Sequence, residues 1–335
     1  MKTIQGTLRL ISYNIAGLPV KSIFEGRSAR RDAAEIGRQI RAAGYDLLAV
    51  QEDFSSYYQL RWAVGAPYYS FSKGNVPAGD GVDIFSRCPL YNVERVPWAQ
   101  SYGGFTYGAA DEYTPKGFMK ATMALAPGAY VDVYNLHAVA GAIDEWDGPW
   151  HEPTIAGACK RAGFEQLRDC IQAHSAGRAL ILLGDFNTVL WKVPDGLYDV
   201  LMEPLGLKDT WAELRNGGRM IYDGGDWEGG ATRDAGSAEY IDKILYRSGG
   251  AVELTAVEAA PVPWSAPGGR SLSDHESWAA TLRYTVTCAR EDGSERLRVP
   301  EPMPAGEKLR GYAAGFRNGA AVLKKELPAL LGRGA

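Results

Sequence analysis

Polar residues that suit chemistry on a phosphoester stand directly after apolar segments in this chain. Gly184-Asp185-Phe186-Asn187 follows the apolar run Ala179 to Leu183, and Ser273-Asp274-His275 lies nearer the end of the sequence. Carboxylate, amide and imidazole groups placed where strands leave a sheet can hold a divalent cation, orient a water molecule and receive phosphate charge. The two segments therefore favour metal-dependent cleavage of a phosphoester.

Three further strand-like segments end in residues of the same kind. Any one such residue is more often a cap or a turn former than a functional group, so their number carries the inference. The three are Asn14 after Leu8 to Tyr13, Glu52 after Asp46 to Val50, and His137 after Tyr130 to Leu136.

The segments between these residues alternate between helix and strand patterns. Ala29 to Ala42 places Ile36 and Ile40 four apart among charged residues, which is typical of an amphipathic helix laid on a sheet. Ile155 to Ala173 is expected to form a second helix. Further strands are expected at Val82 to Phe85, Lys120 to Leu125, Tyr240 to Tyr246 and Ser277 to Val286. Periodicity alone indicates an α/β or α+β protein.

Six short motifs, taken in chain order, resemble the signature series of the endonuclease/exonuclease/phosphatase superfamily. The resemblance extends from about Leu8 to about Leu282. It implies a DNase I-like, four-layer sandwich in which two mixed β-sheets pack face to face, helices cover the outside, and the polar strand ends meet at one edge. The motifs are Tyr13-Asn14, Gln51-Glu52, Asn135-Leu136-His137, Gly184-Asp185-Phe186-Asn187, Ile241-Asp242-Lys243-Ile244-Leu245 and Ser273-Asp274-His275.

A metal site is the first functional expectation. Glu52 is the leading ligand, because Mg²⁺ prefers carboxylate oxygens and keeps most of its waters, and the matching residue has this role in the family. Asn14 and Asp274 are further candidates, as direct or water-mediated ligands. The implied cation is Mg²⁺, with Mn²⁺ as an alternative.

The remaining catalytic expectations concern a water, a phosphate and two histidines. Asp185 and Asn187 are two apart on a segment expected to be extended, so both can project to one sheet edge, where the resemblance has them orient the water and contact the phosphate. His275 accepts a proton as neutral imidazole or stabilises phosphate charge as imidazolium, and the resemblance places Asp242 beside it. His137 would face the phosphate from the other side, as a charge stabiliser or leaving-group acid.

The sequence differs from two branches of the superfamily, which narrows the range of expected substrates. Tyr240 to Lys243 differs from the Trp-Cys-Asp-Arg type segment of inositol-lipid phosphatases, and Thr188 to Leu190 lacks the Asn-rich continuation of abasic-site nucleases. The stretch Tyr107 to Phe118 is similar to the segment before a Lys-Gly motif in neutral sphingomyelinases. Lys116 can reach a lipid phosphate there, although Lys-Gly is also an ordinary turn.

The preferred hypothesis is thus a Mg²⁺-dependent phosphodiesterase acting on a phospholipid such as sphingomyelin. The alternatives are a nuclease acting on DNA or RNA, and a binding module that has the fold without the chemistry. Aromatic residues near Lys116 would form a lipid-landing surface, stack on bases, or lie in the core. They are Trp98, Tyr102, Phe105, Tyr107, Tyr113 and Phe118.

Composition and the ends of the chain complete the expectations. The 335 residues carry a net charge of −4, which argues weakly against a protein that mainly grips long polyanions. The four cysteines are expected to be reduced, and neither a secretory signal nor a transmembrane helix is expected, so a cytoplasmic protein is the default. Residues 1–287 are expected to form the catalytic domain. Residues 288–335 are expected to form a linker and, at 306–335, an amphipathic basic helix that contacts an anionic membrane or folds back on the domain.

Overall fold

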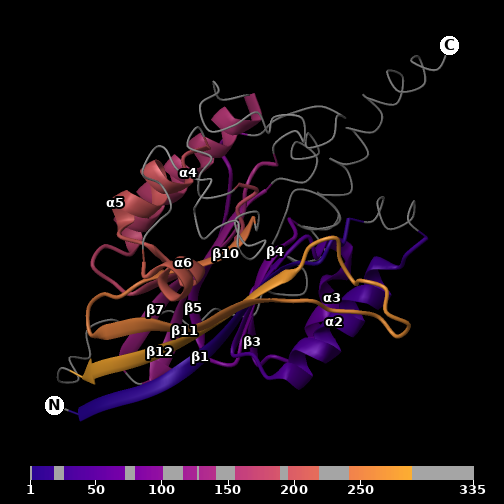
Figure 1. The fold of residues 1–335 in the computed structure, drawn as a ribbon, viewed down its shortest axis with the longest axis horizontal. Coiled ribbons are helices and arrows are strands. Elements are labelled where there is room, and N and C mark those ends of the chain that lie inside the picture. The colour runs from indigo at the N-terminus through magenta and orange to yellow at the C-terminus, as the bar shows by residue number, and fades with distance from the viewer. Residues whose placement is uncertain are drawn as a thin grey trace, which may run out of the picture.

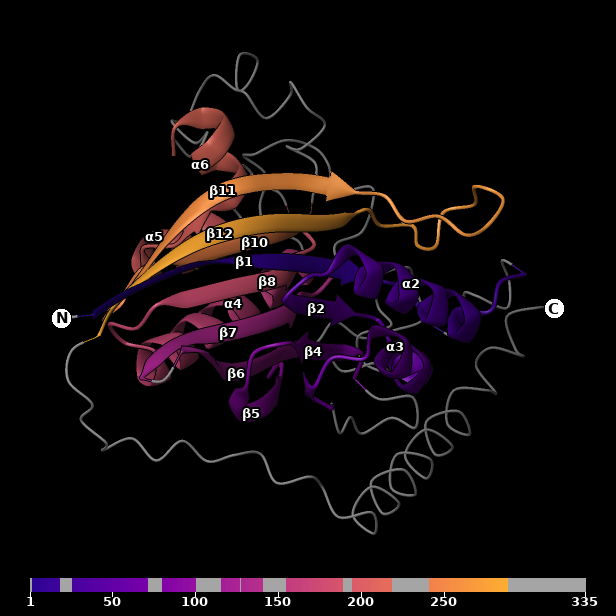
Figure 2. The ribbon, with the colours of Figure 1, turned by 90° about the horizontal axis from the view of Figure 1, so that it is seen from below.

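Two six-stranded β-sheets pack face to face, and helices cover their outer faces (Figures 1 and 2). The computed structural model describes residues 2–18, 26–71, 80–100, 116–126, 128–140, 155–188, 195–218 and 241–288. The arrangement of two mixed sheets flanked by helices confirms the fold expected from the resemblance.

The first sheet, sheet A, contains the N-terminal strand and has the order β11-β12-β1-β2-β4-β3. β1 and β2 run parallel and the other neighbours are antiparallel, so the sheet is mixed. Its strands are β1 (Lys2–Asn14), β2 (Leu47–Gln51), β3 (Tyr68–Tyr69), β4 (Val82–Ser86), β11 (Val252–Val262) and β12 (Ser277–Cys288).

The second sheet, sheet B, has the order β5-β6-β7-β8-β10-β9. Here β7 and β8 are the parallel pair. Its strands are β5 (Leu90–Pro97), β6 (Gly117–Ala126), β7 (Ala129–His137), β8 (Leu180–Asp185), β9 (Lys208–Asp209) and β10 (Asp242–Arg247).

The helices form the two outer layers. α2 (Ala29–Ala43) and α3 (Tyr57–Val64), which follows the short 3₁₀ turn η1 (Phe54–Ser56), pack on sheet A. α4 (Ile155–His174), the π-helix η5 (Leu197–Met202) and α5 (Glu203–Leu205) pack on sheet B. α6 (Thr210–Asn216) contributes Trp211 to the core between the sheets. None of the helices in the described ranges is both long enough and apolar enough to cross a bilayer.

Successive side chains along a strand pack into different hydrophobic cores. In β2, Leu47 and Ala49 pack between the sheets, whereas Leu48 and Val50 pack against α2 and α3. Because successive strand side chains point to opposite faces, a strand covered on both sides reads as a continuous apolar run. This explains why Leu47 to Val50 appeared in the sequence as an unbroken apolar segment.

The expected elements are present with small changes in their ends, and several others were not anticipated. β5, β11 and α3 were not among the expected elements, although Val252 to Ala256 in β11 alternates apolar and polar residues as a half-buried strand does. Trp98 and Phe118 lie in the core under α4, so for these two rings the core alternative is confirmed and they form neither a landing surface nor a base-stacking surface. The other four aromatic residues of that group, the Cys288 side chain and the segment 306–335 lie outside the described residues. Cys88, Cys159 and Cys170 are free thiols.

Strand direction brings the polar strand ends together. β1 and β2 are parallel and end at Asn14 and Gln51, which are paired in register. In sheet B, the last residues of β7 and β8, His137 and Asp185, are also paired, and antiparallel β10 begins at Asp242 opposite Asp185. The expected convergence at one edge therefore follows from two parallel pairs, one in each sheet.

The buried amide of Asn135 ties the two sheets together close to this edge. From β7 its Nδ2 donates to the carbonyl oxygens of Val50 and Asp83 in sheet A, each at 2.8 Å. Gln51 Nε2 donates to Asn135 Oδ1 at 2.6 Å and to Ser12 Oγ at 3.3 Å. These bonds fix the register of sheet A against sheet B directly beside Glu52 and His137.

We expect Asn135→Ala to lower the free energy of unfolding by about 3 kcal/mol, because it leaves buried carbonyl groups and the Gln51 amide without partners. Urea denaturation measures the change. Gln39→Ala is the matched control, since Gln39 also makes two hydrogen bonds but lies at the surface between Glu35 and Ser265. A loss for Asn135→Ala no larger than for Gln39→Ala would contradict this role.

Candidate active site

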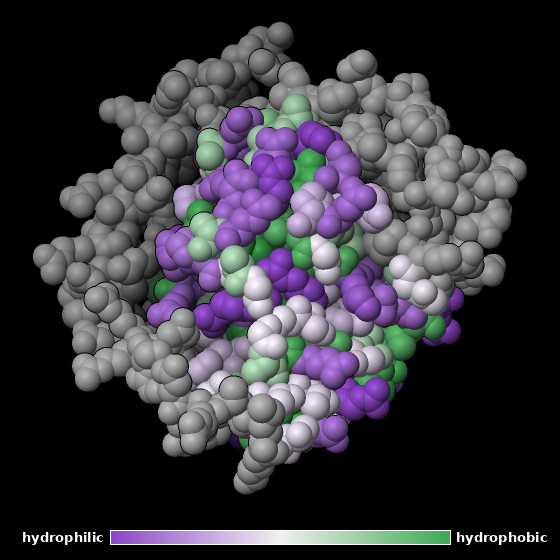
Figure 3. Space-filling view, turned by 90° about the vertical axis from the view of Figure 1, so that its left-hand side faces the viewer, coloured by the Kyte–Doolittle hydropathy of each residue, from purple (hydrophilic) through white to green (hydrophobic). Residues whose placement is uncertain are grey.

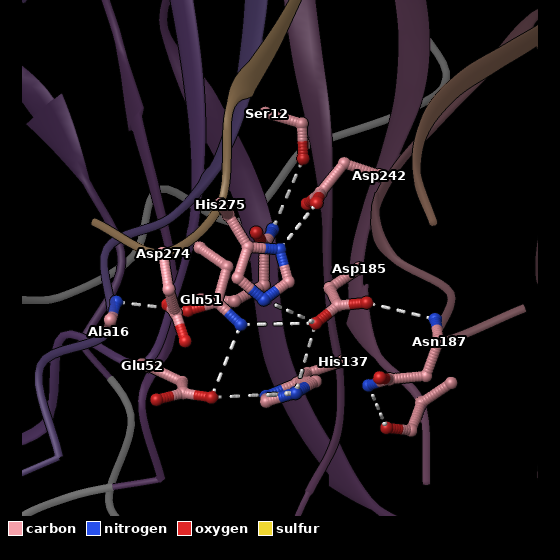
Figure 4. Close-up of polar contacts among 12 residues, drawn as sticks. Ser12, Ala16, Gln51, Glu52, His137, Asp185, Asn187, Asp242, Asp274 and His275 are labelled. Carbon is pink, nitrogen blue, oxygen red and sulfur yellow. Dashed lines mark hydrogen bonds and ion pairs between the residues drawn. The ribbon is translucent and has the colours of Figure 1, made fainter. Parts of the chain in front are cut away.

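Six polar side chains from five strand ends and one loop meet where the edges of the two sheets coincide (Figure 4). Sheet A and its adjoining loops supply Asn14, Glu52 and His275, and sheet B supplies His137, Asp185 and Asp242. The sequence had named all six as site residues, and the structure brings them into mutual contact.

Asp185 lies at the centre of these contacts. Its Oδ2 accepts a hydrogen bond from Asn14 Nδ2 at 3.0 Å, and the same Nδ2 donates to Glu52 Oε1 at 3.2 Å. His137 Nε2 and His275 Nε2 lie 3.4 Å and 3.9 Å from Asp185 Oδ2. A single carboxylate oxygen thus faces groups from both sheets.

A glycine allows Asp185 to be held in this place. Gly184 has φ 148°, and a Cβ there would lie 2.1 Å from the carbonyl oxygen of Leu136 on the neighbouring strand β7. Only glycine accommodates both the backbone angle and this close approach. Gly184 is therefore required for steric reasons, and Asp185 for its carboxylate.

Glu52 sits just beyond the end of β2 in a left-handed conformation. Its φ is 61°, and its backbone N–H donates to the Gly81 carbonyl oxygen at 2.6 Å. Burial raises the pKa of the Glu52 carboxyl, while the charge of Lys116 and the hydrogen bond from Asn14 lower it. Desolvation thus disfavours the charged form of Glu52, and the positive charge of Lys116 partly offsets this effect.

His275 and Asp242 form a close pair across the sheets, with Nδ1 and Oδ2 2.7 Å apart. Burial alone lowers the pKa of His275, but the charge of Asp242 and this hydrogen bond outweigh it and raise the pKa to about 10. Burial raises the pKa of Asp242 to about 6, opposed by the charge of His275. At neutral pH the pair is therefore an imidazolium and a carboxylate, with Nε2 turned toward Asp185.

His137 lies in a different environment from His275. It is 1% exposed, and its Nε2 is 4.0 Å from Glu52 Oε1. Burial holds the pKa of His137 well below its usual range, and the positive charges of Lys116 and His275 add to this effect. The two histidines thus differ in charge, because only His275 has a carboxylate in hydrogen-bonding contact with its second nitrogen.

Asn187 departs from the geometry expected of it. The sequence argument treated residues 185–187 as extended, which is wrong, because β8 ends at Asp185 and Asn187 has φ 48°. Its backbone N–H donates to Asp185 Oδ1 at 2.8 Å, and its Nδ2 donates to the Ala138 carbonyl oxygen at 3.0 Å. Asn187 therefore reaches the site edge through a tight turn that also orients Asp185.

Asp274 and Lys116 lie at the periphery of this cluster. Ser273 Oγ donates to Asp274 Oδ1 at 3.4 Å and to the Asn14 carbonyl oxygen at 2.7 Å, which ties the loop before β12 to the end of β1. Lys116 precedes β6, and its charge acts on Glu52 and His137. Their expected roles as ligand and phosphate contact stay predictions.

The donor groups at this edge fit a hard divalent cation of the Mg²⁺ type. Such an ion commonly takes one or two carboxylates and keeps several waters, so a closed protein cage is not required. Among the described residues no three His, Cys, Asp or Glu side chains form such a cage. Glu52, whose partly buried carboxyl has a raised pKa, is the group that a cation would stabilise most directly.

Sequence reasoning missed a buried lysine that holds the loop after β8. Lys160 Nζ donates to the Asn187 carbonyl oxygen at 2.6 Å and to Asp195 Oδ2 at 3.0 Å, and Thr188 Oγ1 donates to the same Asp195 oxygen at 2.6 Å. The sequence does indicate that this lysine is buried, because Lys160 lies four residues before Phe164, on the apolar face of α4. A lysine on a buried face needs a buried partner.

Two packed mixed sheets with this cluster of polar residues at one edge define a protein of the DNase I-like fold class. The sequence profile of the Endonuclease/Exonuclease/phosphatase family matches residues 11–275, and the protein belongs to this family.

The chain is also similar to individual proteins. A sphingomyelinase of Mycobacterium bovis is 29% identical over 306 residues, which cover 85% of this chain and 54% of the relative. The chain thus spans about half the length of the curated relatives it matches. Beta toxin from Staphylococcus aureus, in a structure with bound magnesium ions, aligns with a TM-score of 0.54 at 16% identity, over 82% of this chain and 99% of the toxin. D. rerio TDP2, in complex with a single-strand DNA product, aligns with a TM-score of 0.55 at 16% identity, over 83% of this chain and 99% of that one.

We expect Lys160→Met to lower the free energy of unfolding by about 3–5 kcal/mol, because it leaves the buried charge of Asp195 without its cation. The next residue provides the control: Arg161 pairs with Asp199 at 2.7 Å, but both side chains are more than a third exposed. Arg161→Met should cost about 1 kcal/mol or less in the same urea titration. Equal losses for the two variants would mean that Lys160 does not hold the loop.

Proposed function

We propose that this protein hydrolyses a phosphodiester bond with the help of a divalent cation, and that its preferred substrate is a phospholipid such as sphingomyelin. The observation that carries the reaction type is the cluster around Asp185 Oδ2, which faces both histidines and the Asn14 amide within 3.9 Å. Such a reaction needs an oriented water, charge stabilisation on the phosphoryl oxygens and protonation of the leaving oxygen.

The side chains divide these tasks. Asp185 Oδ2, aligned by Asn14, orients the attacking water and accepts the proton that it loses as its oxygen bonds to phosphorus. His275, paired with Asp242, donates its Nε2 proton to the leaving oxygen as the P–O bond breaks. His137 and Asn187 contact phosphoryl oxygens, and Lys116 contributes positive charge.

Glu52 would be the principal ligand of the cation, with Asn14 and Asp274 as additional or water-mediated ligands. When bound, Mg²⁺ or Mn²⁺ would neutralise charge on the phosphoryl oxygens. The partly buried carboxyl of Glu52, next to the Asn14 amide, supports this assignment.

The choice of a phospholipid rests on similarity and charge. The mycobacterial relative is named a sphingomyelinase, and the stretch before Lys116-Gly117 is similar to the corresponding segment of neutral sphingomyelinases. The net charge of −4 favours a small head group over a long polyanion. Nuclease activity is the alternative, since the DNA-bound TDP2 structure has the same fold.

Hydrolysis by the purified full chain tests the proposal directly. The panel consists of sphingomyelin, phosphatidylcholine, plasmid DNA, RNA and bis-nitrophenyl phosphate, each with Mg²⁺ or with excess chelator. We expect cleavage of a choline lipid and of bis-nitrophenyl phosphate, and its loss with chelator. Cleavage of nucleic acid but not of lipid would support the nuclease alternative. No cleavage of any substrate would favour a binding module.

His275→Ala and Glu52→Gln should each lower kcat by at least about 100-fold, because each removes a group that acts on developing charge. The measurement is turnover of bis-nitrophenyl phosphate at saturating Mg²⁺, with circular dichroism to verify folding. His174→Ala is the control, since His174 is exposed at the end of α4. Substantial activity in either site variant would show that the centre is misassigned.

A further inference from the structure

The outer face of helices α2 and α3 combines an exposed tryptophan with arginines. Trp62 is 69% exposed, which makes it the most exposed large hydrophobic residue in the described part of the chain. Tyr68 and Tyr69 of the edge strand β3, just after α3, are each 39% exposed, and the Arg61 guanidinium stacks 3.6 Å from the centre of the Tyr69 ring. An exposed aromatic surface of this kind is unusual unless it contacts something.

Packing of the two helices fixes the direction in which Trp62 points. Tyr57 and Leu60 are the buried residues of α3 and face sheet A, so Trp62, two positions after Leu60, lies on the other side of the helix. Gly37 in the middle of α2 allows the close crossing: a Cβ there would lie 2.6 Å from Ala63 Cβ. Trp62 is therefore displayed outward by a tightly packed helix pair.

The two helices border a shallow hollow beside Trp62. Its volume is about 440 Å³, and it is open to solvent. It is lined by Ala34, Arg38, Arg41, Gln59, Trp62 and Ala63. The lining thus has an apolar floor, an aromatic wall and two guanidinium groups.

The charge of this layer is opposite to that of the whole chain. α2 and α3 carry five arginines against Asp32 and Glu35, a net charge of +3, whereas the chain as a whole has −4. Asp32 is buried and paired with Arg27 and Arg270, so it adds little negative charge at the surface. Arg38 is bonded to Glu35, which leaves Arg30, Arg31 and Arg41 as exposed positive groups.

We propose that the outer face of α2 and α3 is a membrane-contact surface that lies on an anionic phospholipid bilayer, with Trp62 at the level of the head groups. This inference rests on the proposed lipid substrate. Tryptophan is enriched at membrane interfaces, and arginines on the same face are attracted by anionic lipids.

The position of this surface relative to the catalytic edge supports the inference. Trp62 is only ten residues after Glu52, and part of that connection is helical, so the two lie within about 25 Å of each other. In Figure 2, α2 and α3 lie toward the end of the molecule at which β1 and β2 finish. One bilayer can therefore meet both the helix face and the site.

The opposite end of the molecule offers a contrast. Figure 3 looks onto the end that lies at the left of Figure 1, away from α2 and α3. Hydrophilic and neutral residues cover most of the described surface there, with hydrophobic residues at scattered positions and along one margin.

Vesicle co-sedimentation of the full chain tests the surface separately from catalysis. Binding is measured with excess chelator present, to vesicles of phosphatidylcholine alone and of phosphatidylcholine with phosphatidylglycerol. We expect tighter binding to the anionic vesicles, and Arg30→Ala/Arg41→Ala, which removes two of the exposed arginines without an ion-pair partner named above, should weaken it about 20- to 30-fold, at about fivefold per arginine. Trp62→Ala should also weaken it. Val257→Ala, which removes a 48% exposed apolar side chain on β11, should leave it unchanged.

A second readout links the surface to turnover. Trp62→Ala should slow hydrolysis of vesicle lipid but not of soluble bis-nitrophenyl phosphate, because it touches no group of the catalytic site. If lipid is not hydrolysed but vesicle binding responds to these variants, the proposed substrate fails and the surface stands. The proposal would be overturned if parent and variants bound vesicles equally, or if no vesicle binding occurred. It would also be overturned if the same variants weakened binding to DNA but not to vesicles.

Discussion

The site depends on how the two β-sheets are positioned against each other, and the buried hydrogen bonds of Asn135 help to fix that position. Apolar side chains between the sheets supply most of the favourable burial, but such packing is not directional. The Asn135 amide, bonded to Val50, Asp83 and Gln51, is directional, because a shift of one strand would leave its buried groups unpaired. Glu52 and His137 are direct neighbours of this bridge along their strands.

The site then combines groups that neither sheet could assemble alone. Asp185 belongs to sheet B, yet the side chain that donates to its Oδ2, Asn14, comes from sheet A. The His275–Asp242 pair likewise spans the two sheets, and the charge of Asp242 raises the pKa of His275, whereas burial lowers the pKa of His137. Lys160 and Asp195 add a buried support beneath the Asp185–Asn187 turn. The two histidines of the site are thus distinguished by environment and not by residue type.

Charge is also distributed unevenly over the outside of the protein. An acidic chain presents a basic helix layer, with the exposed Trp62, close to the catalytic edge. The proposed hydrolysis of a lipid requires the site to be held at a membrane interface. A rigid helix pair crossing at Gly37 suits this need, since it displays an aromatic side chain without uncovering the core.

The sequence by itself indicated the class of fold and the candidate site residues, because six short motifs occur in the order of a recognisable family and most of them adjoin apolar strands. It did not determine the edge strand β5, the short helix α3 or the turn at Asn187, where local patterns are weak and tertiary contacts decide the backbone conformation. Nor did it single out Asn135 and Lys160, whose roles arise only from partners 52 to 85 and 27 to 35 residues away. Tertiary structure alone decided which histidine carries charge, since that depends on burial and on the carboxylate that the opposite sheet places beside His275.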